Sequence, residues 1–271
     1  MMATSRETSN RRFIRSALTL VELLVVVAIM SILLSILLAT LGKVRESARS
    51  VLCKNKLQGV SQSFQLFAED YGHVDRGRES EKLGAHQFRL EDFQDSLYGT
   101  EEFFKQPSGQ FGTIPLDARK QPLICPAGPK GLARDSSFQP AEDTITPLSS
   151  VSVGFNMRLH KANVKIAIGP SQINVLRDVT LTPRILEHPW TPLAFDVDGA
   201  DAQARPQPLV PFYSAPSIDS DDLYANNAFW FPAKRHSGMV HAAFIGGHVW
   251  SSRDPKMAPD WNWSYQPPPD E

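Results

Sequence analysis

The chain has 271 residues, of which 42 % are hydrophobic, 9 % aromatic and 21 % charged, which is ordinary for a globular protein able to bury a core. This composition excludes disorder over the whole length. The net charge of −1 offers no attraction for a polyanion, so we expect no nucleic-acid partner.

The N-terminal segment passes from a basic stretch into an apolar run. Residues 18–41 contain a single ionisable side chain, Glu22. As a helix with a rise of about 1.5 Å per residue, this run would be about 36 Å long, more than the roughly 30 Å of a bilayer core. We therefore predict a transmembrane helix. A carboxylate in such a helix is costly and usually has a partner, although Glu22 is also near enough to the start to reach the headgroups.

A secretory signal is the alternative for this segment, with Arg11, Arg12 and Arg15 at its start and Thr40 and Gly42 near a cut. The apolar part of such a signal is usually about 7 to 15 residues long. The run here is longer and contains a carboxylate, which favours the membrane anchor. Basic residues flank the run on both sides, so charge alone does not decide its orientation.

The residues around the start of the apolar run carry a resemblance to the cleavage and methylation signal of type IV prepilins and pseudopilins. They are Ala17, Leu18, Thr19, Leu20, Val21 and Glu22. The resemblance implies that a prepilin peptidase cuts after Ala17 and methylates the new amine of Leu18. It also implies that Glu22 pairs with the terminal amine of a neighbouring subunit during assembly. The family prefers Gly before the cut and Phe after it, where this chain has Ala17 and Leu18.

The same resemblance implies a location and a set of partners. The leader, residues 1–17, would lie in the cytoplasm, one helix would cross the inner (cytoplasmic) membrane, and the C-terminal domain would be periplasmic. The implied partners are other pilin-like subunits bound through the N-terminal helix, a prepilin peptidase, an inner-membrane assembly platform and membrane lipid.

The helix is predicted to continue after the membrane, through residues 42–72, as an amphipathic stem. Apolar residues recur there at spacings of three and four, as on one face of a helix. This stripe consists of Cys53, Leu57, Val60, Phe64, Phe67 and Tyr71. The opposite, predicted solvated face carries Arg45, Arg49, Lys54, Lys56, Gln58 and Gln62. All 21 prolines lie at or after Pro107, so none interrupts the helix. We interpret the stripe as the surface on which the C-terminal domain packs.

The rest of the chain divides into a loop-rich linker (73–150), a β-rich domain (151–265) and a flexible tail (266–271). Within the linker, residues 88–104 have a weak helical pattern and residues 105–150 are rich in Pro, Gly and Ser. Strand patterns occur at 151–155, 164–168, 173–179, 193–197, 239–245 and 248–251. The predicted fold is α+β and pilin-like, a long N-terminal helix packed on a small antiparallel sheet.

The two cysteines, Cys53 on the stripe and Cys125 in the linker, are far apart in the sequence. In an oxidising compartment they could form a disulfide, which on the entropic model would stabilise the fold by about 4 kcal/mol. Two buried free thiols are the alternative. Their spacing excludes a CxxC redox or zinc motif.

The segment from Arg235 to Val249 carries a second resemblance, to a large pseudopilin-like family in which a His is followed after nine residues by Asp-Gly. His236 and Gly247 match this signature, and the two glycines Gly246 and Gly247 also suit a tight hairpin. Gly246 stands where the family has Asp. This departure removes the carboxylate through which the motif would bind a cation or contact its His.

No metal site or cofactor is predicted, with calcium kept as an alternative. His236, His241 and His248 would point to different faces of a strand pair. Two oxygen-rich stretches, Asp196 to Asp201 and Asp219 to Asp222, lack EF-hand spacing and favour solvated turns. Major pseudopilins do hold calcium in a late loop. No nucleophile elbow, P-loop, dinucleotide-binding Gly motif or HExxH helix is present, so we do not predict an enzyme.

These patterns predict a pilin-like structural subunit, or pseudopilin. It would be cleaved, N-methylated and assembled through its N-terminal helix into a type II secretion or type IV pilus-like filament. The alternative is an uncleaved, signal-anchored extracytoplasmic module that displays its β-rich domain, with all five tryptophans of the chain, to a carbohydrate or protein ligand.

Overall fold

The computed structural model describes residues 20–73, 86–98, 113–115, 124–129, 131–135, 144–168, 171–218, 224 and 227–267. The chain divides into two compact units, Met1–Arg45 and Glu46–Glu271. The predicted leader, with Ala17, and the residues Leu18 and Thr19 lie outside the described residues, as does the acidic stretch 219–222.

In the first unit, the described residues form the beginning of helix α1 (Leu20–His73). Its side chains are exposed throughout this part, including large aliphatic ones such as Leu33. The hydroxyls of Ser31, Ser35 and Thr40 donate to backbone carbonyls of the preceding turn, at 2.7 to 3.0 Å. Every polar group of a helix in lipid needs such an internal partner. Within the described residues, α1 is the one helix long and apolar enough to span a membrane, consistent with single-pass anchoring.

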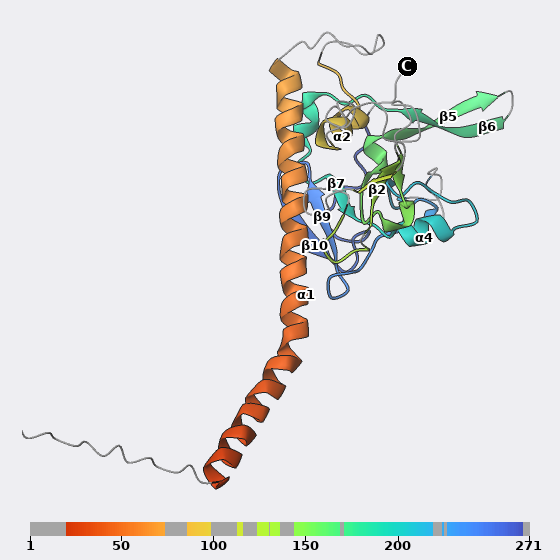
Figure 1. Ribbon diagram of the computed structural model, residues 1–271. Helices are drawn as coiled ribbons and strands as arrows, with labels where there is room; N and C mark the ends of the chain where they lie inside the picture. Colours follow the sequence, from red (N-terminus) through yellow and green to blue (C-terminus); the bar gives the residue numbers. More distant parts are fainter. Residues whose placement is uncertain are drawn as a thin grey trace, which may run out of the picture. The chain divides into compact units, whose positions relative to one another are not determined.

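In the second unit, the rest of α1 buries one face in the β-rich domain (Figure 1). Cys53, Leu57, Val60 and Phe64 of the predicted stripe are at most 2 % exposed. Phe67 is partly buried against the same core, and the side chain of Tyr71 lies outside the described residues.

The border of this buried face includes polar side chains of α1. Lys56 donates to the carbonyl of Ile124 at 3.0 Å, and Gln58 donates to the carbonyl of Gly247. Both residues were expected on the solvated face. Their long side chains instead reach the neighbouring loops, because positions beside an apolar stripe remain close to whatever covers it.

The main sheet has five strands in the order β10-β9-β7-β4-β8. They are β4 (Val153–Asn156), β7 (Pro192–Asp196), β8 (Tyr213–Ser214), β9 (Val240–Phe244) and β10 (Val249–Ser252). All pairs are antiparallel except β4 and β8. The sheet is therefore mixed, and the expectation of a purely antiparallel sheet was wrong. The α+β class is confirmed.

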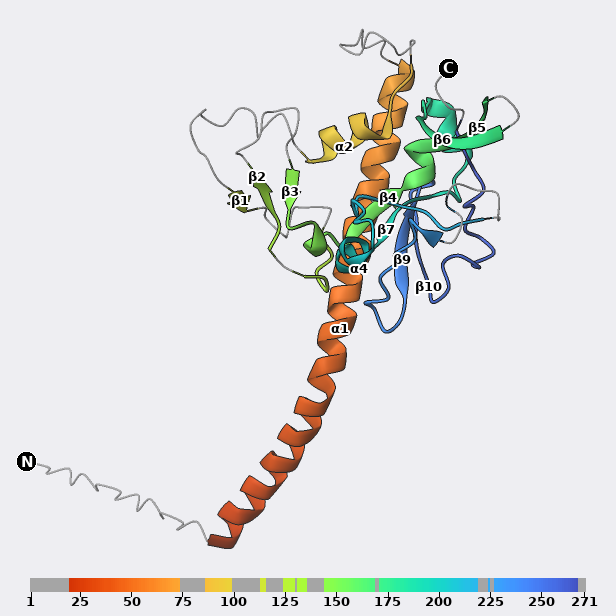
Figure 2. The same cartoon turned by 90° about the vertical axis from the view of Figure 1, so that its right-hand side faces the viewer.

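Smaller elements surround this sheet. Strands β5 (Lys161–Ile168) and β6 (Ser171–Asp178) form a separate hairpin. A three-stranded sheet lies apart from the main one, in the region expected to be loops (Figure 2). Its strands are β1 (Thr113–Pro115), β2 (Ala133–Asp135) and β3 (Thr144–Thr146). The short helices are α2 (Leu90–Tyr98), α4 (Gly199–Ala204) and the 3-10 turns Leu148–Ser150, Met157–Leu159 and Pro183–Glu187.

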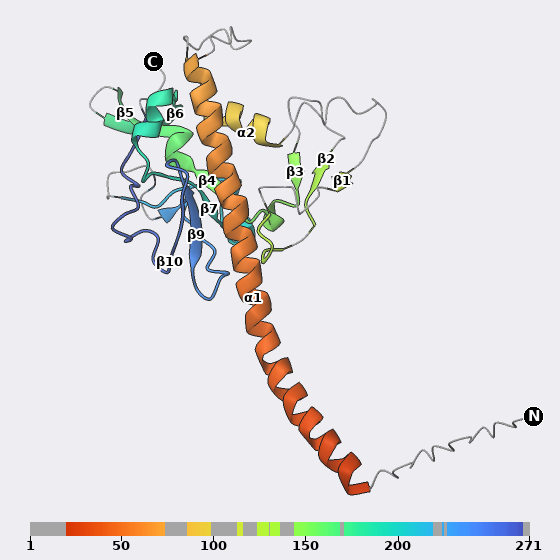
Figure 3. The ribbon, with the colours of Figure 1, turned by 90° about the vertical axis from the view of Figure 1, so that its left-hand side faces the viewer.

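Strands β4, β7 and β9 are buried at every position because other elements cover the sheet. Figure 3 shows α1 beside these strands. In β7, Phe195 packs edge-on against Trp263 with ring centroids 5.3 Å apart, whereas the next residue, Asp196, contacts Cys53 of α1. The alternation of a strand thus directs one side chain toward the C-terminal segment and the next toward the helix.

Replacing Phe64 tests the packing of α1. Phe64 is fully buried, with edge-on ring contacts to Phe88 and Phe93. We expect Phe64→Ala to lower the free energy of unfolding by about 3 to 5 kcal/mol. The measurement is urea unfolding of the full chain in detergent, followed by tryptophan fluorescence. Leu66→Ala, on the same helix but 69 % exposed, is the control, with an expected change within about 0.5 kcal/mol. Equal effects of the two variants would contradict this packing.

Candidate functional site

The carboxylate singled out by the sequence, Glu22, lies in the first turn of α1 and is exposed. An acidic side chain at this end of a helix is favoured by the helix dipole. The residues expected to be cut and methylated lie outside the described part, except Leu20, which is 79 % exposed. The role of Glu22 in assembly therefore stays a prediction.

The residues of the C-terminal signature are placed by the β9–β10 hairpin. Gly247 has a φ of +86°, which explains the need for glycine there. At Gly246, a Cβ would lie 2.6 Å from the Cβ of Pro189 and 2.8 Å from its carbonyl oxygen. The backbone N–H of Gly246 also donates to that carbonyl at 2.9 Å. Pro189 thus occupies the space that an Asp side chain at position 246 would need.

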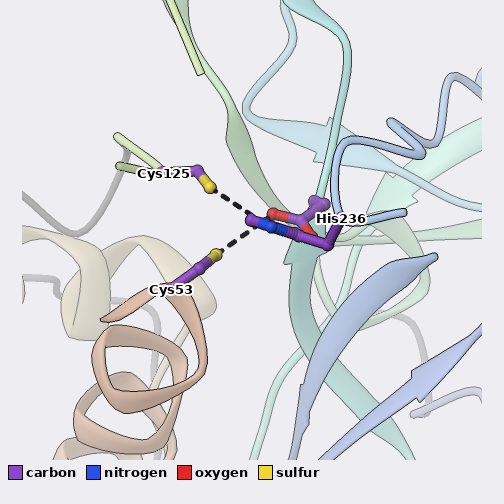
Figure 4. Close-up of side chains that lie close together, drawn as sticks. Cys53, Cys125 and His236 are labelled. Atoms are coloured by element: carbon purple, nitrogen blue, oxygen red, sulfur yellow. Dashed lines mark hydrogen bonds and ion pairs between the residues drawn. The ribbon is translucent and has the colours of Figure 1, made fainter. Parts of the chain in front are cut away.

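His236, the first residue of that signature, belongs to a buried cluster with Cys53, Cys125 and Asp196 (Figure 4). The four residues come from α1, from the loop before β2, from the end of β7 and from the segment before β9. Their ligand-type atoms all lie within 4.8 Å of one another. Both cysteines are free thiols in this arrangement.

The contacts within the cluster are short. The Cys53 thiol donates to Oδ1 of Asp196 at 3.4 Å, and Sγ of Cys125 lies 3.2 Å from Nε2 of His236. The same Nε2 lies 3.6 Å from Oδ2 of Asp196. Each of the four residues is at most 3 % exposed. An imidazole, a carboxylate and two sulfurs therefore lie together in the core, shielded from solvent.

A second layer of groups holds the cluster in place. Oδ2 of Asp196 accepts the backbone N–H of His241 at 2.9 Å, and Nη1 of Arg235 lies 3.9 Å from Oδ1. Arg235 also donates to the carbonyls of Ser152 and Val197. Sγ of Cys125 accepts the backbone N–H of Ala127 at 3.4 Å.

Burial and mutual contact shift the proton affinities in the cluster. Burial raises the pKa of the Asp196 carboxyl to about 7, and the nearby Cys125 sulfur adds to this increase. Contact with Cys53 lowers the pKa of the Cys125 thiol to about 4, against the effect of burial, and His236 lowers it further. Burial alone would lower the pKa of His236, but its hydrogen bond with Cys125 and the charge of Asp196 raise it.

The three histidines considered together in the sequence do not form one site. His241 stacks on His236, with ring centroids 4.2 Å apart, and its Nε2 lies 2.8 Å from the Ser50 hydroxyl. His248 stacks instead on Phe244 at 4.7 Å. Only His236 joins the cysteines and Asp196 in the buried cluster.

In the first oxygen-rich stretch, Asp196 to Asp201, the carboxylates make contacts that stabilise the local structure. Asp198 caps α4, where its side chain accepts the backbone N–H groups of Ala200 and Asp201 at 3.0 and 3.1 Å. Asp201 pairs with Arg205 at 2.9 Å, and Asp196 belongs to the cluster. The calcium alternative for this stretch stays untested.

A pocket of about 590 Å³ lies at the C-terminal segment, lined in part by Trp190, Trp261 and Trp263 together with Lys256 and Asp260. Trp190 is 44 % exposed, so an aromatic surface is accessible at this place. Comparisons of the chain with protein-family models, curated proteins and solved structures gave no match.

The steric restriction at Gly246 can be tested by introducing Asp, the residue that the family signature has at this position. We expect Gly246→Asp to destabilise the protein by about 1 to 3 kcal/mol, because the new side chain would displace Pro189. Thermal or urea unfolding measures the change. Gly59→Ala is the control, since a Cβ there meets nothing within 4 Å and alanine is favoured in a helix by about 1 kcal/mol. A stable Gly246→Asp variant would show that the hairpin accommodates the carboxylate.

Proposed function

We propose that this protein is a pilin-like structural subunit, a pseudopilin, that assembles through its N-terminal helix into a type II secretion or type IV pilus-like filament. The role is structural and not enzymatic. A prepilin peptidase would cut after Ala17 and methylate Leu18. The protein would sit in the inner membrane with its C-terminal domain in the periplasm, next to an assembly platform.

The observation that carries this proposal is the division of α1 into two parts. The first part is predominantly apolar around its whole circumference, and its side chains are exposed in the isolated chain. The second part buries a single face in the β-rich unit. A helix of this kind supports both membrane insertion before assembly and contact with other helices afterwards.

The face of α1 that points away from the β-rich unit supports subunit contact as well. In the second unit it exposes Val51, Leu52 and Leu66, by 54 %, 54 % and 69 %. Exposed aliphatic side chains along a helix are the type of surface that packs against other helices. Neighbouring stems would cover them in a filament.

Glu22 would determine how neighbouring subunits pair within the apolar bundle of helices. A carboxylate in a low-dielectric environment is stabilised by an ammonium group, and the methylated amine of Leu18 on an adjacent subunit would supply one. The exposed position of Glu22 in the first turn of α1 is compatible with this role.

Replacement of Glu22 tests the assembly step. We expect Glu22→Ala to reduce the assembled fraction by at least about tenfold, because an unpaired ammonium would remain in the apolar bundle. Filament content would be measured by shearing and sedimentation of cells that express the full chain. Glu69→Ala removes an exposed carboxylate from the same helix and is the control. Assembly of Glu22→Ala at the level of the control would contradict the proposed role.

Determining the N-terminal residue of the protein isolated from its native membrane tests the processing step. Mass spectrometry is expected to find N-methylated Leu18. An intact Met1 would favour the signal-anchored module instead, in which the tryptophan-lined pocket of about 590 Å³ would be the ligand site. A terminus near Lys43 would indicate a secreted domain. The last two results would each overturn the filament proposal.

A further inference from the structure

We propose that Cys53, Cys125, Asp196 and His236 bind one Zn²⁺ ion, which fastens the second part of α1 to the β-rich domain. This site is independent of filament assembly and rests on the geometry of the cluster.

Three of the distances in the cluster are close to those between ligands of a tetrahedral zinc ion. Zinc lies about 2.3 Å from thiolate sulfur and about 2.0 to 2.2 Å from imidazole nitrogen or carboxylate oxygen, so ligand atoms around it are about 3.4 to 3.8 Å apart. Here the separations are 3.4 Å between Sγ of Cys53 and Oδ1 of Asp196, 3.2 Å between Sγ of Cys125 and Nε2 of His236, and 3.6 Å between Oδ2 of Asp196 and the same Nε2. Shifts of a few tenths of an ångström would complete the coordination.

The chemistry of the four side chains favours zinc among divalent ions. Two sulfurs, one imidazole nitrogen and one carboxylate oxygen form a ligand set of intermediate softness, of the kind that zinc binds with tetrahedral coordination. Calcium and magnesium prefer sets made only of oxygen. All four residues are at most 3 % exposed, so the protein supplies every ligand and leaves no position for water. Closed sites of this type are structural.

The charges around the cluster suit a divalent cation. Two thiolates and one carboxylate would carry three negative charges, and Zn²⁺ together with the Arg235 guanidinium, 3.9 Å from Asp196, would balance them. The backbone N–H groups of His241 and Ala127, which donate to Asp196 and Cys125, would orient these ligands.

A disulfide is the competing arrangement, since Sγ of Cys53 and Sγ of Cys125 lie within 4.8 Å of each other. It would need neither Asp196 nor His236. Both residues nevertheless point at the sulfurs from separate segments of the chain, within 3.4 and 3.2 Å. The convergence of four ligands of three chemical types on one place is the arrangement that a metal ion requires.

The test uses the full chain with an affinity tag that contains no histidine, extracted in detergent without chelator. Elemental analysis is expected to find about one zinc per chain. After chelation and reloading with Co²⁺, visible absorption is expected to show tetrahedral cobalt bound to thiolate. Cys125→Ser and His236→Gln should each lose the zinc, and Arg235→Met should weaken zinc binding by about 10-fold to 100-fold. His248→Gln, outside the cluster, should retain it.

Three results would overturn the proposal. The first is absence of zinc from the purified chain, both as isolated and after incubation with Zn²⁺ under conditions that keep the cysteines reduced. The second is a Cys53–Cys125 disulfide in the protein from its native membrane, detected by mass spectrometry after alkylation. The third is equal zinc retention by Cys125→Ser, His236→Gln and His248→Gln. If the ligand variants do not fold, the cobalt spectrum of the unaltered chain still decides between metal binding and its absence.

Discussion

The burial of one face of α1 in the β-rich unit is the contact on which the second unit depends. Leu57, Val60 and Phe64 enter the core that also contains the strands β4, β7 and β9. The Ser61 hydroxyl, fully buried in the same face, donates to the carbonyl of Phe244 in β9. Apolar burial thus provides the bulk of the attraction, while single polar contacts fix the position of the helix along the strands.

The stripe and most strands could be predicted from sequence because both depend on local periodicity. Residues on one helix face recur every three or four positions. The runs that became β7 and β9 are mostly apolar without alternation, because both faces of these strands are covered. Strand β8, only Tyr213–Ser214, is too short to show any period. Its parallel pairing with β4 is set by the tertiary fold alone, and so are the three-residue strands β1 to β3.

The buried cluster could not be predicted, because its residues are joined by the fold and not by the sequence. Cys53 and Asp196 are 143 residues apart, and Cys125 and His236 are 111 apart. Rules for metal motifs depend on short spacings that keep two ligands on one turn or helix. One sign was available: Asp196 ends an apolar strand pattern, and a carboxylate there needs a partner if the strand is buried.

The departure from the C-terminal signature at Gly246 has a physical account. Gly246 cannot carry a carboxylate without moving Pro189, yet His236 still has a carboxylate 3.6 Å away, supplied by Asp196 of β7. Because β7 lies between β4 and β9, this partner is held by hydrogen bonds on both sides of its strand. A carboxylate on a central strand is more rigidly placed than one on a hairpin turn, which favours a fixed ligand geometry. Asp196 also contacts Cys53, so the rigidity of the sheet extends to α1.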